Sequence, residues 1–252
     1  MNTPLDVRLE RGILTLTLNR PDKRNALDTP TLDALHAAME RADLDAEVRV
    51  VAVRGAGKDF CAGADLGELL ASADAPPEQN ERAALHLGGL FVRIRELPKP
   101  VMAVVHGRAL AGGAGLATAC DLVVAAASAQ FGYPEIQRGF VPAMVMTLLR
   151  RLTGEKVAFD LAATGRVLSA SEALAAGLVS RILPDAAFEA ESGRILAGLA
   201  ATSASALALT KRQFYQLDGL SFSEGISLGA QVNALARSTP DFKQAIAAFL
   251  AK

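Results

Sequence analysis

The stretch ALAGGAGLATACD, residues 109–121, decides the fold of this chain, together with FCAGADL at residues 60–66. In each stretch, small residues run into a predicted helix start. Small residues let a ligand carbonyl approach the backbone closely, and a helix start presents unpaired N–H groups at the positive end of the helix dipole. Two such loops that converge on one oxygen form an oxyanion hole, a pair of donors for a negatively charged oxygen. The two stretches therefore predict an anion-stabilising site made of backbone groups.

Composition and charge are those of an ordinary folded protein. The chain has 252 residues, of which 51% are hydrophobic and 21% charged, enough for one large domain or one domain with a small appendage. Lys and Arg number 26 against 27 Asp and Glu, a balance that argues against a nucleic-acid partner. The start MNTPLDVRLE has no signal-peptide pattern, and the uncharged run 109–120 is too short and too rich in Gly and Ala for a membrane span. We therefore expect a cytoplasmic protein that does not bind membranes.

The cysteines and histidines predict structure rather than chemistry. Cys61 and Cys120 fit neither a disulfide framework nor a metal-ligand spacing, and we expect buried free thiols in a reducing compartment. His36 and His86 fall in predicted helices, whereas His106 ends a predicted strand beside the Gly-rich loop. For His106 a structural hydrogen bond is favoured over a catalytic role. No phosphate-loop, dinucleotide-binding, GxSxG or HExxH motif is present, and we predict no metal site.

Hydrophobic patterning predicts an α/β protein, because short apolar strands alternate with helices, an order typical of βαβ units with parallel strands. The predicted strands cover 6–10, 13–18, 48–53, 101–105, 122–125 and 178–182, the first two as a hairpin. Helices are predicted from a cap at Asp28 or Thr29, from Asp65, over 81–97, 143–152, 155–163 and 171–176, and from 186 onward. DAPP at 74–77 predicts a mobile flap over a cleft. Together these predict a core domain over residues 1–190 and a helical C-terminal region over 191–252.

Five segments in order resemble the enoyl-CoA hydratase/isomerase superfamily, which has the crotonase fold, and the resemblance covers nearly the whole chain. They are LNRPDKRNALD (18–28), KDFCAGADLGEL (58–69), KPVMAVVHGRALAGGAGLATACDLVVA (99–125), FGYPEIQRGFVPA (131–143) and TGRVLSASEALAAGLVSRILP (164–184). The resemblance implies a spiral core of ββα turns and a helical C-terminal trimerisation region. It also implies assembly as a homotrimer or a dimer of trimers.

The resemblance places an oxyanion hole on the backbone N–H groups of Ala64 and Gly112, with Glu135 as acid/base. It implies an acyl-CoA thioester substrate and no separate cofactor, since CoA enters as part of the substrate. The residues it implies for substrate and CoA binding are Lys23, Arg24, Ala26, Ala62, Asp65, Leu66, Gly113 and Pro134. Lys23 and Arg24 are the phosphate candidates, although a solvated turn is an equal alternative. Lys211 is a weaker candidate for a phosphate of a neighbouring subunit's ligand.

The chain departs from the family pattern at one of the two glutamates that typical hydratases use, because that position is Gly115 here. A pair of carboxylates can hold and activate a water molecule, whereas one carboxylate is enough to move a proton from C2 to C4 of a 3-enoyl thioester. An apolar pocket is expected to raise the pKa of Glu135. The residues expected to line this pocket are Phe131, Tyr133, Ile136, Phe140 and Val141. A second departure is Pro142-Ala-Met-Val-Met146 in place of a Gly-rich run.

Several functions stay open at this stage. The residues favour double-bond isomerisation, while frequency within the family favours hydration, for which Glu68 or Asn80 are candidate stand-ins for the missing glutamate. A related acyl-CoA lyase or thioester hydrolase on the same scaffold is one alternative. The other is a catalytically weak subunit that binds CoA thioesters.

Overall fold

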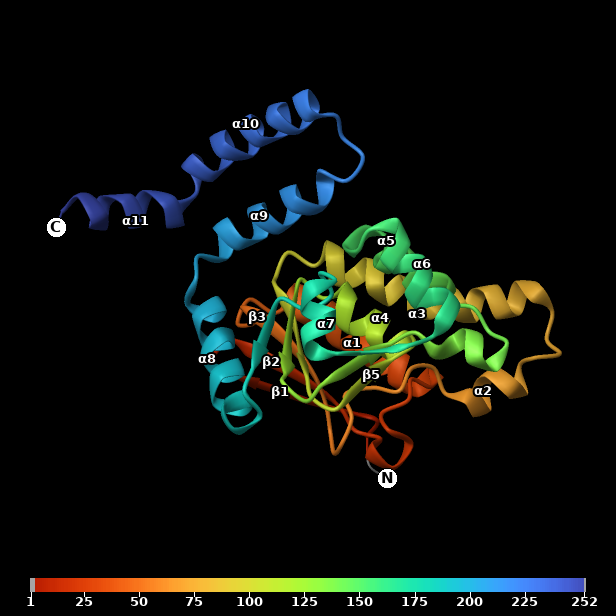
Figure 1. Cartoon of the computed structure of the whole chain (residues 1–252). Coiled ribbons are helices and arrows are strands. Elements are labelled where there is room, and N and C mark those ends of the chain that lie inside the picture. The colour runs from red at the N-terminus through yellow and green to blue at the C-terminus, as the bar shows by residue number, and fades with distance from the viewer. Residues whose placement is uncertain (1–2, 252) are drawn as a thin grey trace.

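Two hydrogen-bonded sheets organise the chain in the computed structural model, which describes residues 3–251 (Figure 1). The larger sheet has the strand order β1-β2-β3-β4-β6-β9. Its strands are β1 (Leu5–Glu10), β2 (Ile13–Leu18), β3 (Val50–Gly55), β4 (Val101–Val105), β6 (Leu122–Ala126) and β9 (Arg181–Leu183). Only the β1–β2 hairpin is antiparallel, and every later neighbour pairs in parallel. The hairpin and the parallel pairing are confirmed.

A small second sheet holds the segment just before the second small-residue loop. It consists of β5 (Arg108–Leu110), β7 (Gln130–Gly132) and β8 (Val167–Ser169). Two isolated bridges, Leu27 with Ala64 and Cys61 with Ala109, connect the loops around it. Residues far apart in the sequence therefore lie side by side at this place.

Helices cover the sheets and extend beyond them. They are α1 (Thr29–Leu44), α2 (Leu66–Ala71), α3 (Pro77–Glu96), α4 (Gly112–Ala119), α5 (Ala143–Leu152), α6 (Glu155–Thr164), α7 (Ala170–Ala175), α8 (Phe188–Ala201), α9 (Ala204–Gln216), α10 (Phe222–Ser238) and α11 (Pro240–Leu250). Short 3-10 helices are η1 (Pro21–Lys23), η2 (Pro134–Arg138) and η3 (Asp185–Ala187). Helix α4 is buried along its whole length and packs against α3 and α5. The helix with the predicted oxyanion glycine is thus part of the core.

Two helix starts are confirmed where the sequence has capping residues. The Asp28 carboxylate accepts a hydrogen bond from the Thr31 N–H at the start of α1, and Asp65 accepts from the Gly67 N–H at the start of α2. Helix α3 begins at Pro77, earlier than the predicted residue 81, because proline fits the first turn of a helix. Strand β9 begins at Arg181, after a turn at Gly177, so the predicted strand 178–182 is wrong at its start.

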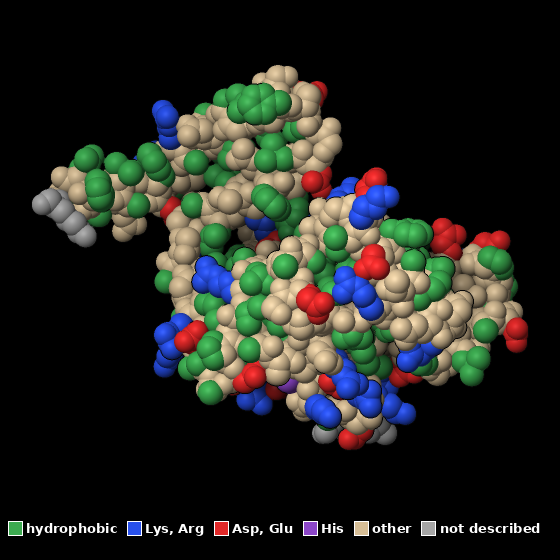
Figure 2. Space-filling view, in the orientation of Figure 1, with side chains coloured by type: hydrophobic (Ala, Val, Ile, Leu, Met, Phe, Trp, Pro, Cys, Tyr) green, Lys and Arg blue, Asp and Glu red, His purple; other side chains and the backbone are tan. Residues whose placement is uncertain are grey.

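Helix α9 packs against α3, and α10 and α11 pack on α9 and extend away from the sheets, with the C-terminus at the far end (Figure 1). Green, hydrophobic surface covers much of these helices in Figure 2. Their exposed large apolar side chains include Phe214, Phe222, Ile226, Leu235, Phe242, Ile246, Phe249 and Leu250. Helix α8 still packs on the larger sheet. The domain division at residue 190 and the predicted trimer both stay predictions.

Within residues 3–251 no single helix has the length and apolar character of a membrane span, although η3 and α8 together with α9 form a bent pair that meets both criteria. No group of three His, Cys, Asp or Glu side chains in this part of the chain could hold a metal ion. Cys61 and Cys120 are buried free thiols, as predicted, and burial raises the pKa of Cys61 to about 12. The ring Nε2 of His106 lies 2.8 Å from the carbonyl oxygen of Gly57, which confirms the predicted structural hydrogen bond.

Candidate active site

The N–H groups of Ala64 and Gly112 approach each other across two loops. The Leu27 N–H donates to the Gly63 carbonyl at 2.8 Å, and the Asp65 N–H donates to the Leu27 carbonyl at 2.9 Å. Because successive N–H groups of an extended segment point to opposite sides, the Ala64 N–H points away from Leu27. A Cβ added at Gly112 would lie 3.7 Å from the Ala64 nitrogen. Neither N–H has a backbone acceptor within residues 3–251, so both are available to a ligand oxygen.

A strained residue holds the second donor in place. Ala111, the residue before α4, has φ 52° and ψ −127°, a conformation that L-residues other than glycine rarely adopt. Its own N–H donates to the Gly132 carbonyl at 2.8 Å, and its carbonyl accepts from the Gly115 N–H at 3.0 Å. Strain of this kind costs about 1–3 kcal/mol and persists only where the surroundings enforce it. No signal in the sequence predicts this strain, because an alanine before two glycines is not unusual.

Gly113 is required for packing. A Cβ at this position would lie 2.4 Å from the Cys61 carbonyl oxygen, which is closer than any real contact. The start of α4 therefore fits against the Cys61 loop only with glycine here. This close approach sets the spacing between the two loops that carry Ala64 and Gly112.

Glu135 lies in η2 with one carboxylate oxygen, Oε2, buried and without a hydrogen-bond partner among the described residues. Burial raises the pKa of Glu135 above its usual range, opposed by a backbone hydrogen bond and by Arg138. The predicted direction is therefore confirmed. Of the predicted apolar wall, Phe131 and Tyr133 are wholly buried. The other three predicted wall residues are exposed, and their place beside Glu135 stays a prediction: Ile136, Phe140 and Val141.

The position of the missing glutamate has no space for a side chain. A Cβ at Gly115 would lie 2.3 Å from Cγ1 of Val145 and 2.9 Å from Cζ of Phe91. Val145 comes from α5 and Phe91 from α3, so two apolar side chains close this place against α4. The two departures from the family pattern are therefore one packing arrangement, in which the bulkier α5 fills the space next to Gly115.

Both candidate stand-ins for that glutamate make local contacts in this structure. The Glu68 carboxylate accepts hydrogen bonds from the N–H and the hydroxyl of Thr29, both at 3.0 Å. The Asn80 amide donates to the Ala75 carbonyl at 3.4 Å. Both side chains hold local structure near α1 and the start of α3, and the structure gives no support for either as a second catalytic group.

The predicted CoA-binding residues of the two loops lie side by side. The Ala62 N–H donates to the Arg24 carbonyl at 3.0 Å, which joins the loop of Lys23, Arg24 and Ala26 to the loop of Ala62 and Asp65. The side chains most exposed to solvent are those of Lys23, Arg24 and Leu66, while Ala26, Ala62 and Asp65 are half-buried. Pro134 lies elsewhere, in η2, next to Gly165. CoA contacts at these residues stay a prediction.

Lys211 does not have the predicted role. Its Nζ donates to the Asp121 carboxylate at 2.7 Å and to the carbonyl groups of Ile94 at 2.7 Å and Lys99 at 2.9 Å. An ammonium group has three donors, and all three are used inside this chain. Tyr215 adds a hydrogen bond to the same carboxylate at 2.8 Å. Lys211 therefore anchors α9 to the core, and the expectation that it contacts a neighbour's phosphate was wrong.

Comparison with known proteins identifies the family of this chain. The sequence profile described as enoyl-CoA hydratase/isomerase matches residues 8–252. The chain belongs to the enoyl-CoA hydratase/isomerase family. A putative enoyl-CoA hydratase of Thermus thermophilus is 42% identical over 247 residues, which is 98% of each chain. The 1,2-epoxyphenylacetyl-CoA isomerase of Escherichia coli is 31% identical over 246 residues, covering 97% of this chain and 94% of that one.

The fold is also shared. The crystal structure of an enoyl-CoA hydratase from Mycobacterium smegmatis has a TM-score of 0.94 at 34% identity, covering 99% of this chain and 97% of that one. The predicted crotonase-type α/β fold with a helical C-terminal region is confirmed. Hydratase and isomerase names both occur among the relatives at moderate identity, so the choice between the two reactions depends on the site itself.

Proposed function

We propose that this chain isomerises the double bond of an enoyl-CoA thioester, with Glu135 as the single acid/base and the Ala64 and Gly112 N–H groups as the oxyanion hole. The observation that carries the proposal is the closed space at Gly115. Val145 and Phe91 occupy the place from which a second carboxylate would reach the substrate. One carboxylate and two backbone donors are the complete requirement for a proton shift, and family membership supports the substrate class.

The proposed reaction has two proton transfers. The Glu135 carboxylate takes the proton from C2 of a 3-enoyl thioester, and the negative charge moves to the thioester oxygen between the two N–H donors. The protonated Glu135 then returns the proton at C4, the double bond forms between C2 and C3, and the carbonyl is restored. A raised pKa suits both steps, since a base and its conjugate acid transfer protons best when their pKa is close to the working pH.

Hydration is the second candidate, because the Thermus thermophilus relative is described as a putative enoyl-CoA hydratase. Addition of water needs a water molecule positioned and activated at C3, and a pair of carboxylates does this well. In this chain the groups at Gly115 are apolar, and Glu68 and Asn80 are bonded elsewhere. These contacts favour isomerisation over hydration.

The test is the ultraviolet absorbance of the conjugated thioester, starting from a trans-3-enoyl-CoA. We expect the absorbance to rise and stay high with the natural protein, and we expect no rise with Glu135→Gln. Glu155→Gln is the matched control, because the Glu155 side chain is 70% exposed and pairs only with Arg150 on the surface.

Other results would contradict the proposal in different ways. A rise followed by decay would mean that the product is also hydrated. Consumption of the substrate with release of free CoA would mean a thioester hydrolase. Tight binding of the thioester without any turnover would identify a binding subunit, and full activity in Glu135→Gln would exclude Glu135 as the acid/base.

A further inference from the structure

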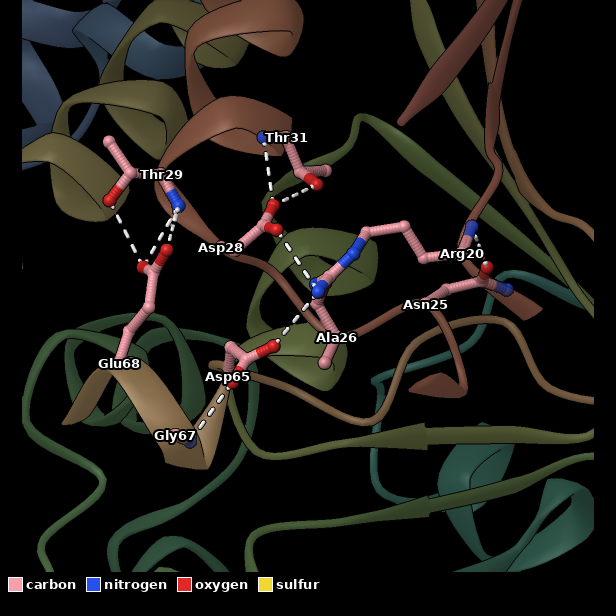
Figure 3. Close-up of polar contacts among 9 residues, drawn as sticks. All are labelled: Arg20, Asn25, Ala26, Asp28, Thr29, Thr31, Asp65, Gly67 and Glu68. Atoms are coloured by element: carbon pink, nitrogen blue, oxygen red, sulfur yellow. Dashed lines mark hydrogen bonds and ion pairs between the residues drawn. The ribbon is translucent and has the colours of Figure 1, made fainter. Parts of the chain in front are cut away.

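Arg20 lies at the centre of a polar cluster that joins three segments (Figure 3). Its Nη2 lies 3.0 Å from the Asp28 carboxylate and 3.0 Å from the Asp65 carboxylate, and its Nη1 donates to the Ala26 carbonyl at 2.6 Å. Asp28 caps α1 and Asp65 caps α2, so one guanidinium connects two helix starts with the loop between them. The Arg20 side chain is only 21% exposed, which strengthens these contacts relative to a surface pair.

Two of the groups that Arg20 contacts lie next to the first proposed oxyanion donor, the Ala64 N–H, or next to its bridge partner. Asp65 directly follows Ala64, and Ala26 directly precedes Leu27, the bridge partner of Ala64. The Arg20 hydrogen bond is also the main reason that the pKa of Asp65 is lowered. The guanidinium therefore contacts a chain neighbour of each bridge partner, Asp65 next to Ala64 and Ala26 next to Leu27.

Arg20 is also connected to the neighbouring loop through Asn25. The Arg20 N–H donates to the Asn25 side chain at 3.0 Å, and the Asn25 amide donates to the Ala56 and Asp59 carbonyls at 2.8 Å each. Asn25 has φ 56°, so the loop turns through a left-handed residue that these bonds enforce. The backbone N–H of Arg20 therefore also takes part in the hydrogen bonds that shape this loop.

We propose that Arg20 is a positioning residue, whose guanidinium fixes the direction of the Ala64 N–H toward Gly112. A planar guanidinium can hold a carbonyl and two carboxylates in one fixed geometry, whereas a lysine ammonium is a point charge on a flexible stem. The proposal rests on the proposed function in one respect, that the Ala64 N–H receives the thioester oxygen. A displacement of a donor by about 1 Å costs on the order of a hundredfold in rate.

The test reads the polarisation of a bound carbonyl directly. Butyryl-CoA labelled with carbon-13 at the thioester carbonyl has no double bond to isomerise or hydrate, and its carbonyl stretch moves to lower frequency when two N–H groups donate to it. We expect a clear shift on binding to the natural protein, and a much smaller shift in Arg20→Met with binding largely kept. For the isomerase reaction we expect kcat to fall by roughly tenfold or more with a smaller change in KM, and Arg20→Lys to recover part of the loss.

Two further variants keep the test decisive. Arg93→Met is the matched control, because Arg93 pairs with Asp43 at 2.8 Å between α3 and α1, away from Ala64; it should keep the full carbonyl shift. If Arg20→Met does not fold, Asp65→Asn keeps a helix cap but weakens the contact to Arg20, and it should reduce the shift.

The outcomes separate this proposal from the proposed function. A full carbonyl shift in folded Arg20→Met, or in Asp65→Asn, would overturn the role of Arg20 alone. A natural protein that binds the probe without any shift would overturn the oxyanion hole, and the role of Arg20 with it. A normal shift without isomerase activity would contradict only the reaction.

Discussion

Val145 of α5 and Gly115 of α4 share one space in the core of the candidate site. A Cβ at Gly115 would lie 2.3 Å from Cγ1 of Val145, so a larger residue at one position requires a smaller residue at the other. Under the proposed function this contact matters for the reaction, because the same space would have to accommodate a second catalytic carboxylate. Two of the predictions below follow from this contact.

The first concerns stability. Gly115→Ala should destabilise the protein by about 1–3 kcal/mol, because overpacking outweighs the gain of about 1 kcal/mol that alanine gives in a helix. In a Val145→Ala background the loss should be smaller, because the contact with Val145 is relieved while Phe91 Cζ still lies 2.9 Å from the added Cβ. Urea unfolding of the four proteins measures the coupling between the two positions. Equal effects of Gly115→Ala in both backgrounds would mean that α4 and α5 move apart freely.

The second concerns the reaction. Gly115→Glu combined with Val145→Gly should gain hydratase activity, seen as loss of absorbance from a 2-enoyl-CoA, because two carboxylates can then hold a water molecule. Val145→Gly alone is the control and should not gain it. A folded double variant that still only isomerises would show that the missing carboxylate is not what decides the reaction.

The third concerns pH. Burial raises the pKa of Glu135 in the folded protein above its usual range. A raised folded pKa means that its contribution to stability is present below the unfolded pKa and is lost as pH rises through the folded pKa. Glu135→Gln does not titrate, so it should become more stable than the natural protein as pH rises through that window, while its activity is lost. Unfolding curves from pH 4 to pH 8 check the sign, and a constant difference across that range would contradict it.

The fourth concerns the attachment of α9. Lys211→Met leaves the Asp121 carboxylate buried without its counter-ion, and we expect a loss of about 3–5 kcal/mol in the free energy of unfolding. Adding Asp121→Asn should recover part of that loss. Chemical denaturation measures both. A loss below about 1 kcal/mol for Lys211→Met would mean that Tyr215 and the Val101 N–H, which also donate to Asp121, are sufficient.

Local signals in the sequence predicted much of the fold. Asp28 and Asp65 identified helix starts because a capping side chain bonds to an N–H group only two or three residues away. The buried parallel strands were recognisable as short apolar runs. The start of α3 was placed too late, since the prolines at 76 and 77 were interpreted as a loop although proline also suits a first turn. The order of the motifs then gave the family.

What the sequence did not show depends on contacts between distant positions. Lys211 meets Asp121 across 90 positions, and Arg20 meets Asp65 across 45. Nothing near Lys211 in the sequence distinguishes a buried anchor from a surface cation. Val145 likewise fits Gly115 only once α4 and α5 are packed together, so each departure from the family pattern looked independent until the structure joined them.

Ala111 has a consequence for which sequences this family member can accept. Its side chain has no role in the proposed chemistry, yet its backbone lies where few residue types are comfortable. A β-branched residue is excluded there by sterics, and glycine relieves the strain at the cost of a looser turn before Gly112. A selection for activity should therefore accept few substitutions at Ala111, whereas a selection for folding alone should accept more. Some variants at this position should fold and yet be inactive.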